Sequence, residues 1–166
     1  MILDLKSVFI SDGASLPVSF EMDMHEMVFS GICPIRKPVK IEGSVFNRAG
    51  IVTADLLCEV LFSAPCDRCG KETEKKHSVH IERVLVQKLA DESSDEIIEI
   101  PDMKLDVEEL CNDEIVLYLP MKHLCRDDCK GVCAMCGKDL NEGKCGCSSV
   151  SHDPRLEALA QLLNDN

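Results

Sequence analysis

The sequence is poor in aromatic side chains and lacks several features that define common protein classes. Tryptophan is absent and aromatic residues make up only 4% of the 166 residues, so valine, leucine and isoleucine have to fill the core. Phosphate-binding glycine loops of the Walker or dinucleotide type are missing. The length suits one domain with a modest core plus a small, metal-stapled module.

Long apolar segments are also missing. The chain contains no run of about 18 apolar residues, which argues against a membrane span. At the N-terminus, Asp4, Lys6 and Asp12 interrupt the apolar stretch that a signal peptide requires. We therefore expect a soluble, cytoplasmic protein without a membrane partner.

Negative charge is abundant but unevenly distributed. The net charge is −12, and residues 91–120 carry eleven acidic side chains and one basic side chain. Non-specific nucleic-acid binding by the whole surface is therefore disfavoured, because such binding depends on neutralising phosphates. The acidic segment suits a solvated surface, an electrostatic contact for a basic protein, or a surface that repels premature RNA contacts.

Cysteine is the residue in excess. The chain has eleven cysteines, six of them between residues 125 and 147, and a further pair is formed by Cys66 and Cys69. In a reducing compartment, clustered Cys-x-x-Cys pairs are more typical of metal ligands than of disulfides. A tight turn can direct both thiolates of such a pair at one zinc ion, and Gly70 and Gly137 provide the backbone freedom that the turn needs.

Eight cysteines are the candidate ligands of one or two structural Zn²⁺ ions. They are Cys66, Cys69, Cys125, Cys129, Cys133, Cys136, Cys145 and Cys147. The preferred division assigns the last four to one site and the first four to the other. A zinc ion with four thiolate ligands has no open position for water, so the expected role is structural rather than hydrolytic.

The weak point of this division is the Cys145-x-Cys147 pair. On an extended strand the two residues would stand roughly 6.6 Å apart, against about 3.8 Å between sulfurs on one tetrahedral zinc. Either Gly146 bends the chain or one of the two cysteines serves the other site. His123 lies two residues before Cys125 and could replace a cysteine as ligand.

The other three cysteines, Cys33, Cys58 and Cys111, are interpreted as packed thiols. A nucleophilic-cysteine enzyme would need a cysteine with a nearby histidine and an orienting carboxylate, which the sequence by itself can neither place nor exclude. No catalytic constellation emerges from it. We expect a protein that is not an enzyme and has no small-molecule substrate.

Strand patterns are strongest in the middle third of the chain. Residues 39–45 have apolar side chains in one phase, and the turn-like segment 47–50 follows. Residues 51–62 are apolar on both faces apart from Thr53, Asp55 and Glu59. This pattern predicts a hairpin whose second strand is central. Residues 76–88 form the next candidate strand, so residues 66–70 would be the tip between two long antiparallel strands.

The strand at residues 76–88 changes phase in its middle. Val79 and Ile81 share one face, whereas Val84 and Val86 share the other. A bulge near Glu82 and Arg83 would turn both pairs inward.

Helices and one short strand are expected in the last third. Residues 97–100 suit a short strand that ends at Pro101. Asp106 can cap a helix that places Val107, Leu110, Cys111 and Ile115 near one face. The pair Asp153 and Pro154 predicts the start of a C-terminal helix.

The overall prediction is an α+β fold. Its core is an antiparallel sheet with hairpins around residues 38–88, accompanied by a few helices and a C-terminal zinc-ribbon-like module. We expect a domain over residues 1–120, whose acidic segment covers 91–120, a Cys-rich module over 121–150 packed on it, and a C-terminal helix over 151–166. Together these parts form one structural unit.

The Cys-rich segment 124–147 and the later Asp153-Pro154-Arg155-Leu156 resemble the C-terminal signature of the bacterial YceD family. The N-terminal Leu3-Asp4-Leu5, the strand that contains Gly43 and the tip with Cys66 and Cys69 are similar to the same family. The resemblance implies a large ribosomal RNA subunit accumulation protein, which is linked to normal levels of 23S ribosomal RNA and has no established enzymatic activity.

The resemblance implies a ribosomal RNA precursor or a large-subunit ribosomal protein as partner. Nucleic-acid contacts would fall on the basic side chains that dot the Cys-rich module. These are Lys122, Arg126, Lys130, Lys138 and Lys144. Two alternatives stay open, namely a thiol redox sensor that loses zinc on oxidation and a zinc-ribbon adaptor that binds only protein.

Overall fold

The computed structural model describes residues 1–88 and 97–147. Its strands are β1 (Ile2–Asp4), β2 (Ser15–Met22), β3 (Val39–Arg48), β4 (Ile51–Pro65), β5 (Glu72–Val86), β6 (Ile97–Glu99) and β7 (Lys104–Asp106). Its helices are α1 (Lys6–Ile10) and α2 (Val107–Tyr118). The predicted C-terminal helix and the acidic residues 91–96 lie outside the described residues.

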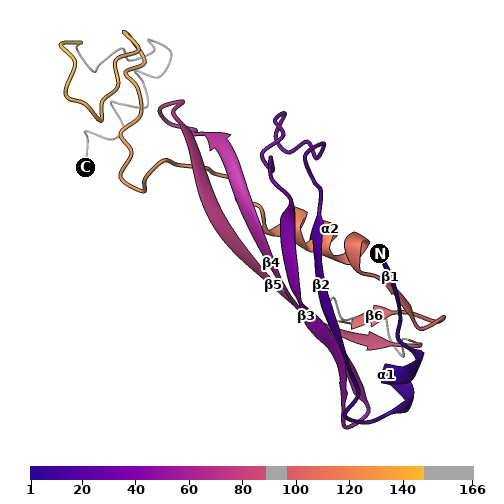
Figure 1. Ribbon diagram of the computed structural model, residues 1–166. Coiled ribbons are helices and arrows are strands. Elements are labelled where there is room, and N and C mark those ends of the chain that lie inside the picture. Colours follow the sequence, from indigo (N-terminus) through magenta and orange to yellow (C-terminus); the bar gives the residue numbers. More distant parts are fainter. Residues whose placement is uncertain (89–96, 148–166) are drawn as a thin grey trace, which may run out of the picture.

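A long, twisted sheet forms the body of the molecule (Figure 1). In the described part of the chain it has the strand order β2-β3-β4-β5-β6, and β1 pairs with β7 in a separate ribbon. The α+β class is confirmed. The antiparallel pairing expected around residues 38–88 is confirmed. At one edge the sheet is mixed, because β6 pairs in parallel with β5 through Val84 and Ile97.

The β3–β4 hairpin turns where the sequence predicts it. Its strands pair up to Arg48 and Ile51, and the side chain of Asn47 stabilises the turn. The amide of Asn47 donates to the carbonyl of Val8 over 2.8 Å, and its oxygen accepts from the backbone N–H of Gly50. Since Asn47 is buried, these bonds meet the hydrogen-bonding needs of a polar group removed from water.

The β4–β5 hairpin is the longest feature of the sheet, with 15 residues in each strand. The expected bulge near Glu82 is wrong, because the register runs without interruption and pairs Leu56 with Ile81 and Ala54 with Arg83. Arg83 can therefore face the helix side of the sheet. There it forms an ion pair with Glu114 of α2, over 2.6 Å, so the inward-facing charge is neutralised and no bulge is needed.

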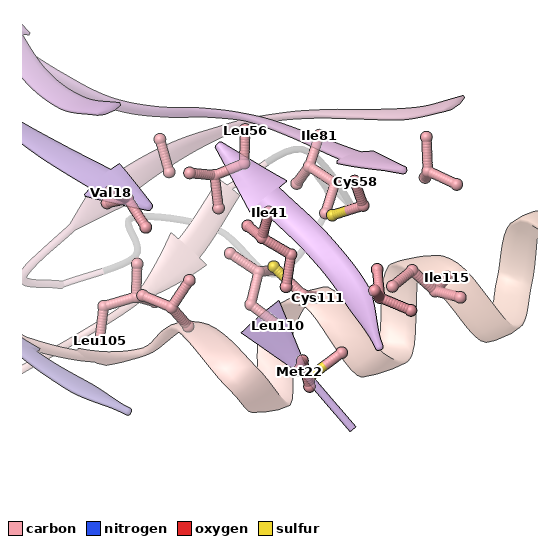
Figure 2. Close-up of a cluster of buried hydrophobic side chains, with 14 of the residues drawn as sticks. Val18, Met22, Ile41, Leu56, Cys58, Ile81, Leu105, Leu110, Cys111 and Ile115 are labelled. Atoms are coloured by element: carbon pink, nitrogen blue, oxygen red, sulfur yellow. The ribbon is translucent and has the colours of Figure 1, made fainter. Parts of the chain in front are cut away.

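The core lies between the sheet and α2, as Figure 2 shows. Asp106 caps this helix by accepting from the backbone N–H groups of Glu108 and Glu109, as the sequence predicts. The four residues expected on its buried face, Val107, Leu110, Cys111 and Ile115, are all buried.

Two of the three cysteines interpreted as packed thiols are in this core. Cys58 of β4 and Cys111 of α2 are fully buried. The interpretation is wrong for Cys33, which is exposed, because it lies in the irregular segment between β2 and β3 rather than on a packed face. No helix within residues 1–88 and 97–147 has the length and apolarity needed to cross a membrane.

Candidate metal centres

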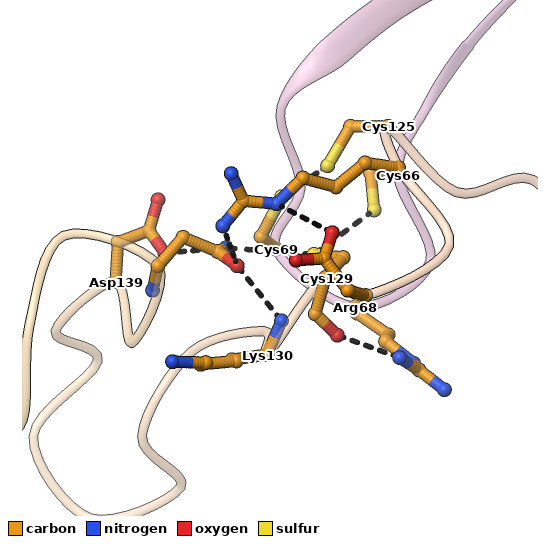
Figure 3. Close-up of polar contacts among 10 residues, drawn as sticks. Cys66, Arg68, Cys69, Cys125, Cys129, Lys130 and Asp139 are labelled. Carbon is orange, nitrogen blue, oxygen red and sulfur yellow. Dashed lines mark hydrogen bonds and ion pairs between the residues drawn. The ribbon is translucent and has the colours of Figure 1, made fainter.

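Four cysteines meet at the tip of the β4–β5 hairpin and form what we call the first cluster: Cys66, Cys69, Cys125 and Cys129. The Sγ atoms of Cys66 and Cys129 are 3.8 Å apart, and those of Cys69 and Cys125 are 3.7 Å apart (Figure 3). All four sulfurs lie within 4.8 Å of one another. A tetrahedral zinc ion with Zn–S bonds of about 2.3 Å requires sulfurs about 3.8 Å apart, so the donor set fits zinc.

A tight turn brings the two hairpin thiols of this cluster together. The backbone N–H of Gly70 donates to the carbonyl of Cys66 over 2.8 Å, and the N–H of Cys66 donates to the carbonyl of Lys71 over 2.9 Å. Gly70 has a φ of +72°, a left-handed conformation that glycine adopts without a steric cost. The i, i+3 spacing of cysteines therefore closes the turn that the sequence predicts.

The second cluster, Cys133, Cys136, Cys145 and Cys147, repeats this design. Its sulfurs also lie within 4.8 Å of one another. The N–H of Gly137 donates to the carbonyl of Cys133 over 2.8 Å, and the N–H of Cys133 donates to the carbonyl of Lys138 over 2.9 Å. The two turns thus have matching hydrogen bonds, and Gly137 has a φ of +71°.

Both members of the Cys145-x-Cys147 pair belong to the second cluster. The chain bends at Gly146 and Cys147 instead of continuing as a strand, which removes the spacing problem of an extended backbone. The structure therefore groups the eight sulfurs in the two sets of four that the sequence favours.

The thiols of each cluster differ in acidity. Burial opposes ionisation of Cys66, but backbone N–H groups of Cys125, Arg68 and Cys69 donate to its sulfur and lower its pKa to about 6. In the second cluster, the backbone N–H groups of Cys136 and Met135 lower the pKa of Cys133 to about 6. Each turn therefore stabilises one thiolate with backbone dipoles.

Other thiols in the clusters resist ionisation. Burial and then the neighbouring sulfurs of Cys129 and Cys69 raise the pKa of Cys125 to about 12. The sulfur of Cys136, followed by burial, raises the pKa of Cys147 to about 12. Closely spaced thiolates repel one another, so full ionisation of either set calls for a bound cation.

Asn141 links the first cluster to the loop that carries the second. Its side-chain amide donates to the Sγ atom of Cys129 over 3.4 Å, and its oxygen accepts from the backbone N–H of Lys130 and from Arg126, each over 2.8 Å. Asp139 in turn accepts from the amide of Asn141 (Figure 3). Contacts of this kind orient ligands and adjust their charge.

The backbone around Gly131 packs directly on the hairpin tip. The N–H of Val132 donates to the carbonyl of Arg68 over 3.2 Å, and the guanidinium of Arg68 donates to the carbonyl of Cys129 over 2.6 Å. A Cβ atom at Gly131 would lie 2.8 Å from the same Arg68 carbonyl oxygen. Only glycine fits this approach, and the loop of the second cluster is held against the first.

His123 has a structural role instead of the ligand role considered from sequence. It is buried, its Nε2 atom lies 2.7 Å from the hydroxyl of Thr73, and its backbone N–H donates to the carboxylate of Asp67 over 2.6 Å. Within the described residues it belongs to neither group of metal-compatible side chains. It fastens the segment before Cys125 to the hairpin.

The five basic side chains predicted to contact nucleic acid are all exposed. Arg126 is engaged by Asp128 and Asn141, and the ammonium of Lys138 donates to the carbonyl of Lys144 over 3.3 Å. Acidic residues alternate with them along the same module. Contact with nucleic acid stays a prediction.

Sequence reasoning missed Asn141, Arg68 and Asp67 as supports of the first cluster. All three are ordinary polar residues close to cysteines, and nothing in their local pattern marks them. Their partners lie 12 to 61 residues away along the chain. Only the approach of the hairpin tip to the Cys-rich module reveals these supports.

Residues 55–163 match the family described as large ribosomal RNA subunit accumulation protein YceD. The chain belongs to the YceD family. The matched span includes most of β4, all of β5 and α2, and all eight cysteines of the two clusters, so the candidate metal centres lie inside the YceD region.

Two known proteins are similar to parts of the chain. The chain is 21% identical to large ribosomal RNA subunit accumulation protein YCED homolog 1, chloroplastic, from Arabidopsis thaliana, over 78% of this chain and 50% of that protein. It is 35% identical to the uncharacterized protein Rv2926c of Mycobacterium tuberculosis, over 42% of this chain and 33% of that protein. The chain thus spans half or less of the length of these relatives. No solved structure matches it.

Proposed function

We propose that this YceD protein is a non-enzymatic, cytoplasmic factor in the biogenesis of the large ribosomal subunit and supports the accumulation of 23S ribosomal RNA. The observation that carries the proposal is the family match over residues 55–163. The relative from Arabidopsis, whose name refers to the accumulation of the large ribosomal RNA subunit, supports it. The partner is a precursor of ribosomal RNA or a protein of the large subunit.

In this proposal each cysteine cluster binds one Zn²⁺ ion. The first cluster would cross-link the tip between Cys66 and Cys69 to the segment 125–129, and the second would close the loop 133–147 on itself. A zinc ion bound by four thiolates is redox-inert and has no open coordination position. The metal would therefore contribute folding free energy and a zinc-ribbon-like surface, not a chemical step.

The test is ribosome sedimentation, with 23S and 16S RNA quantified, in cells depleted of this protein. Depletion should reduce 23S RNA and free large subunits while 16S RNA is retained. Rescue should be compared between wild type, the Cys133→Ser/Cys136→Ser variant and the matched control Cys33→Ser, which changes an exposed cysteine outside both clusters. An unchanged profile on depletion would contradict the proposal.

A redox function is the second candidate, and the exposure of Cys136 and Cys147 favours it. Exposed thiolates oxidise more readily than buried ones, and their oxidation releases bound zinc. Peroxide should then eject zinc from the second cluster and produce holdase activity towards unfolded proteins. If zinc is lost without any holdase activity, the redox candidate is excluded.

A further inference from the structure

The outer face of α2 is acidic at its start and apolar at its end. Glu108, Glu109 and Asp113 are exposed on the first two turns. Beyond them, Leu117 is 82% exposed, and Met121, just after the helix, is 98% exposed. Residues four apart lie on one helical row, so Glu109, Asp113 and Leu117 form one stripe on the surface.

The apolar end of this stripe is unusual for a soluble surface. Val116 and Tyr118 are also exposed, so four large apolar side chains are exposed within six consecutive residues. Isolated exposed apolar side chains are common, whereas contiguous ones mark interaction sites. The ring of Tyr118 lies edge-on to that of His77 on β5, with 6.2 Å between the ring centroids. The patch therefore adjoins the sheet at the end of α2.

A groove extends the acidic half of this face. It has a volume of about 350 Å³, with Ile98, Ile100 and Leu110 among its apolar lining residues. Its charged lining consists of four carboxylates and one ammonium group, namely Glu99, Asp106, Glu109, Asp113 and Lys104. Residues 97–120 contain seven acidic side chains and one basic side chain, Lys104. The negative potential of the face therefore coincides with apolar surface.

We infer that this face of α2 docks a basic polypeptide segment that carries apolar side chains. Charge complementarity selects this occupant. Carboxylates repel the phosphates of RNA and of anionic lipids, and a second copy of this chain has a net charge of −12. Lysine or arginine side chains of the segment would face Glu109 and Asp113, and its apolar side chains would cover Leu117 and Met121.

This inference rests on the proposed function. Of the two partners proposed there, it selects a protein of the large subunit instead of ribosomal RNA. The full-length, zinc-loaded chain is titrated into a fluorescent 12-residue peptide of paired arginines and leucines, and anisotropy is recorded. A peptide with glutamate in place of arginine and a 12-nucleotide single-stranded RNA are the comparison probes. Only the basic peptide should bind, and added salt should weaken it.

The variant Leu117→Ser/Met121→Ser should weaken binding at least about tenfold, since it removes the apolar anchors. Its control, Ile10→Ser/Ile51→Ser, changes two apolar residues on other elements that are 81% and 55% exposed, and should bind as wild type does. Asp113→Lys should weaken binding about threefold or more. Its control, Glu82→Lys, reverses an exposed charge on the sheet face away from α2 and should not.

Equal binding by the Leu117→Ser/Met121→Ser variant and its control overturns the inference, as does tighter binding of the RNA probe. The two proposals can also fail separately. If depletion lowers 23S RNA but the Leu117→Ser/Met121→Ser variant restores it fully, the docking face is wrong and the ribosomal function stands. If depletion changes nothing, the ribosomal function fails whatever the peptide does.

Discussion

The two cysteine clusters have the same four candidate thiol ligands and the same turn, but they differ in what supports them. In the first cluster Cys66 and Cys129 are buried, and Asn141, Arg68 and the long β4–β5 hairpin hold the ligands from outside. In the second cluster Cys136 and Cys147 are exposed, and the ligands come from a single short loop. The same four thiols can thus lie in a site that the surrounding protein preorganises, as in the first cluster, or in a loop that metal binding would have to order, as in the second.

The two clusters do not depend equally on each other. The loop of the second cluster contacts the rest of the molecule through the backbone hydrogen bond from Val132 to Arg68 and through Asn141, which donates to Cys129 of the first cluster. These contacts act on both clusters, but the first cluster also has the β4–β5 hairpin as support. We therefore expect order in the second cluster to depend on the first more than the reverse. The predictions below test this dependence.

Loss of a ligand should have the largest effect. We expect Cys129→Ser to abolish zinc binding in the first cluster and to weaken it in the second, because the loop loses its support. Cys136→Ser should remove only the second zinc ion. Native mass spectrometry gives the number of zinc ions per chain, and hydrogen exchange shows which amides lose protection. Loss of both zinc ions in Cys136→Ser, together with loss of only one in Cys129→Ser, would contradict this order of dependence.

The contact between the clusters should be next in size. Gly131 has a φ of +73° and no room for a Cβ atom beside the Arg68 carbonyl. Gly131→Ala should therefore destabilise the docked loop by about 1–3 kcal/mol and speed up zinc transfer from the second cluster to a chromogenic chelator. The control Gly50→Ala has a similar φ of +83° but no atom within 4 Å of the added Cβ. Equal chelation rates for both variants would show that the contact is unimportant.

Removal of the amide beside the first cluster should have a smaller effect. Asn141→Ala removes the hydrogen bond to the Cys129 sulfur and should weaken zinc binding in the first cluster by about tenfold, the low end for outer-sphere contacts. Competition with a chelator of known affinity measures this. Asn112→Ala, which changes an exposed amide on α2, is the matched control. An unchanged zinc affinity in Asn141→Ala would mean that the Asn141 amide does not contribute to the zinc affinity of the first cluster.

The smallest expected effect concerns pH and the hairpin beneath the first cluster. Burial, followed by the charges of His123 and Lys75, lowers the pKa of His77 below 6.5, and its Nε2 atom is buried without a partner among the described residues. The folded state therefore favours neutral His77. The stability that this residue contributes is present above about pH 6.5 and is lost as the pH falls, because the unfolded chain takes up the proton first.

His77→Phe should reduce the loss of Tm between pH 7 and pH 5.5 relative to wild type, as thermal unfolding followed by circular dichroism can show. Acid release of zinc affects both proteins, so the difference between them isolates the histidine. His80→Gln, at an exposed position on the opposite face of β5, should behave as wild type does. An unchanged pH response in His77→Phe would rule out this role.

Local features were predictable because their causes are local. The cap at Asp106, the buried face of α2 and the two cysteine turns each depend on residues within one or two turns of backbone. The hairpin tip at residues 66–70 was also predictable, because two strand patterns enclose it. The grouping of sulfurs followed from the same spacing, combined with the need for four thiolates per zinc ion.

Other features depended on distant partners and could not be predicted. The ion pair between Arg83 and Glu114 makes the bulge unnecessary, yet the two residues are far apart in the chain. The parallel pairing of β6 depends on where the chain re-enters after residue 88. Asn141 supports Cys129 only because the loop folds back on the hairpin.

The sequence by itself determined the thiol chemistry of the candidate ligands, the turn geometry, the acidic character of residues 97–120 and the helix α2, because spacing and side-chain type act over short range. The tertiary structure decided which cluster is sheltered and which is exposed. It also decided that the apolar end of α2 is exposed beside an acidic groove. Burial and mutual support arise only when segments distant in sequence pack together, and no local pattern encodes that arrangement.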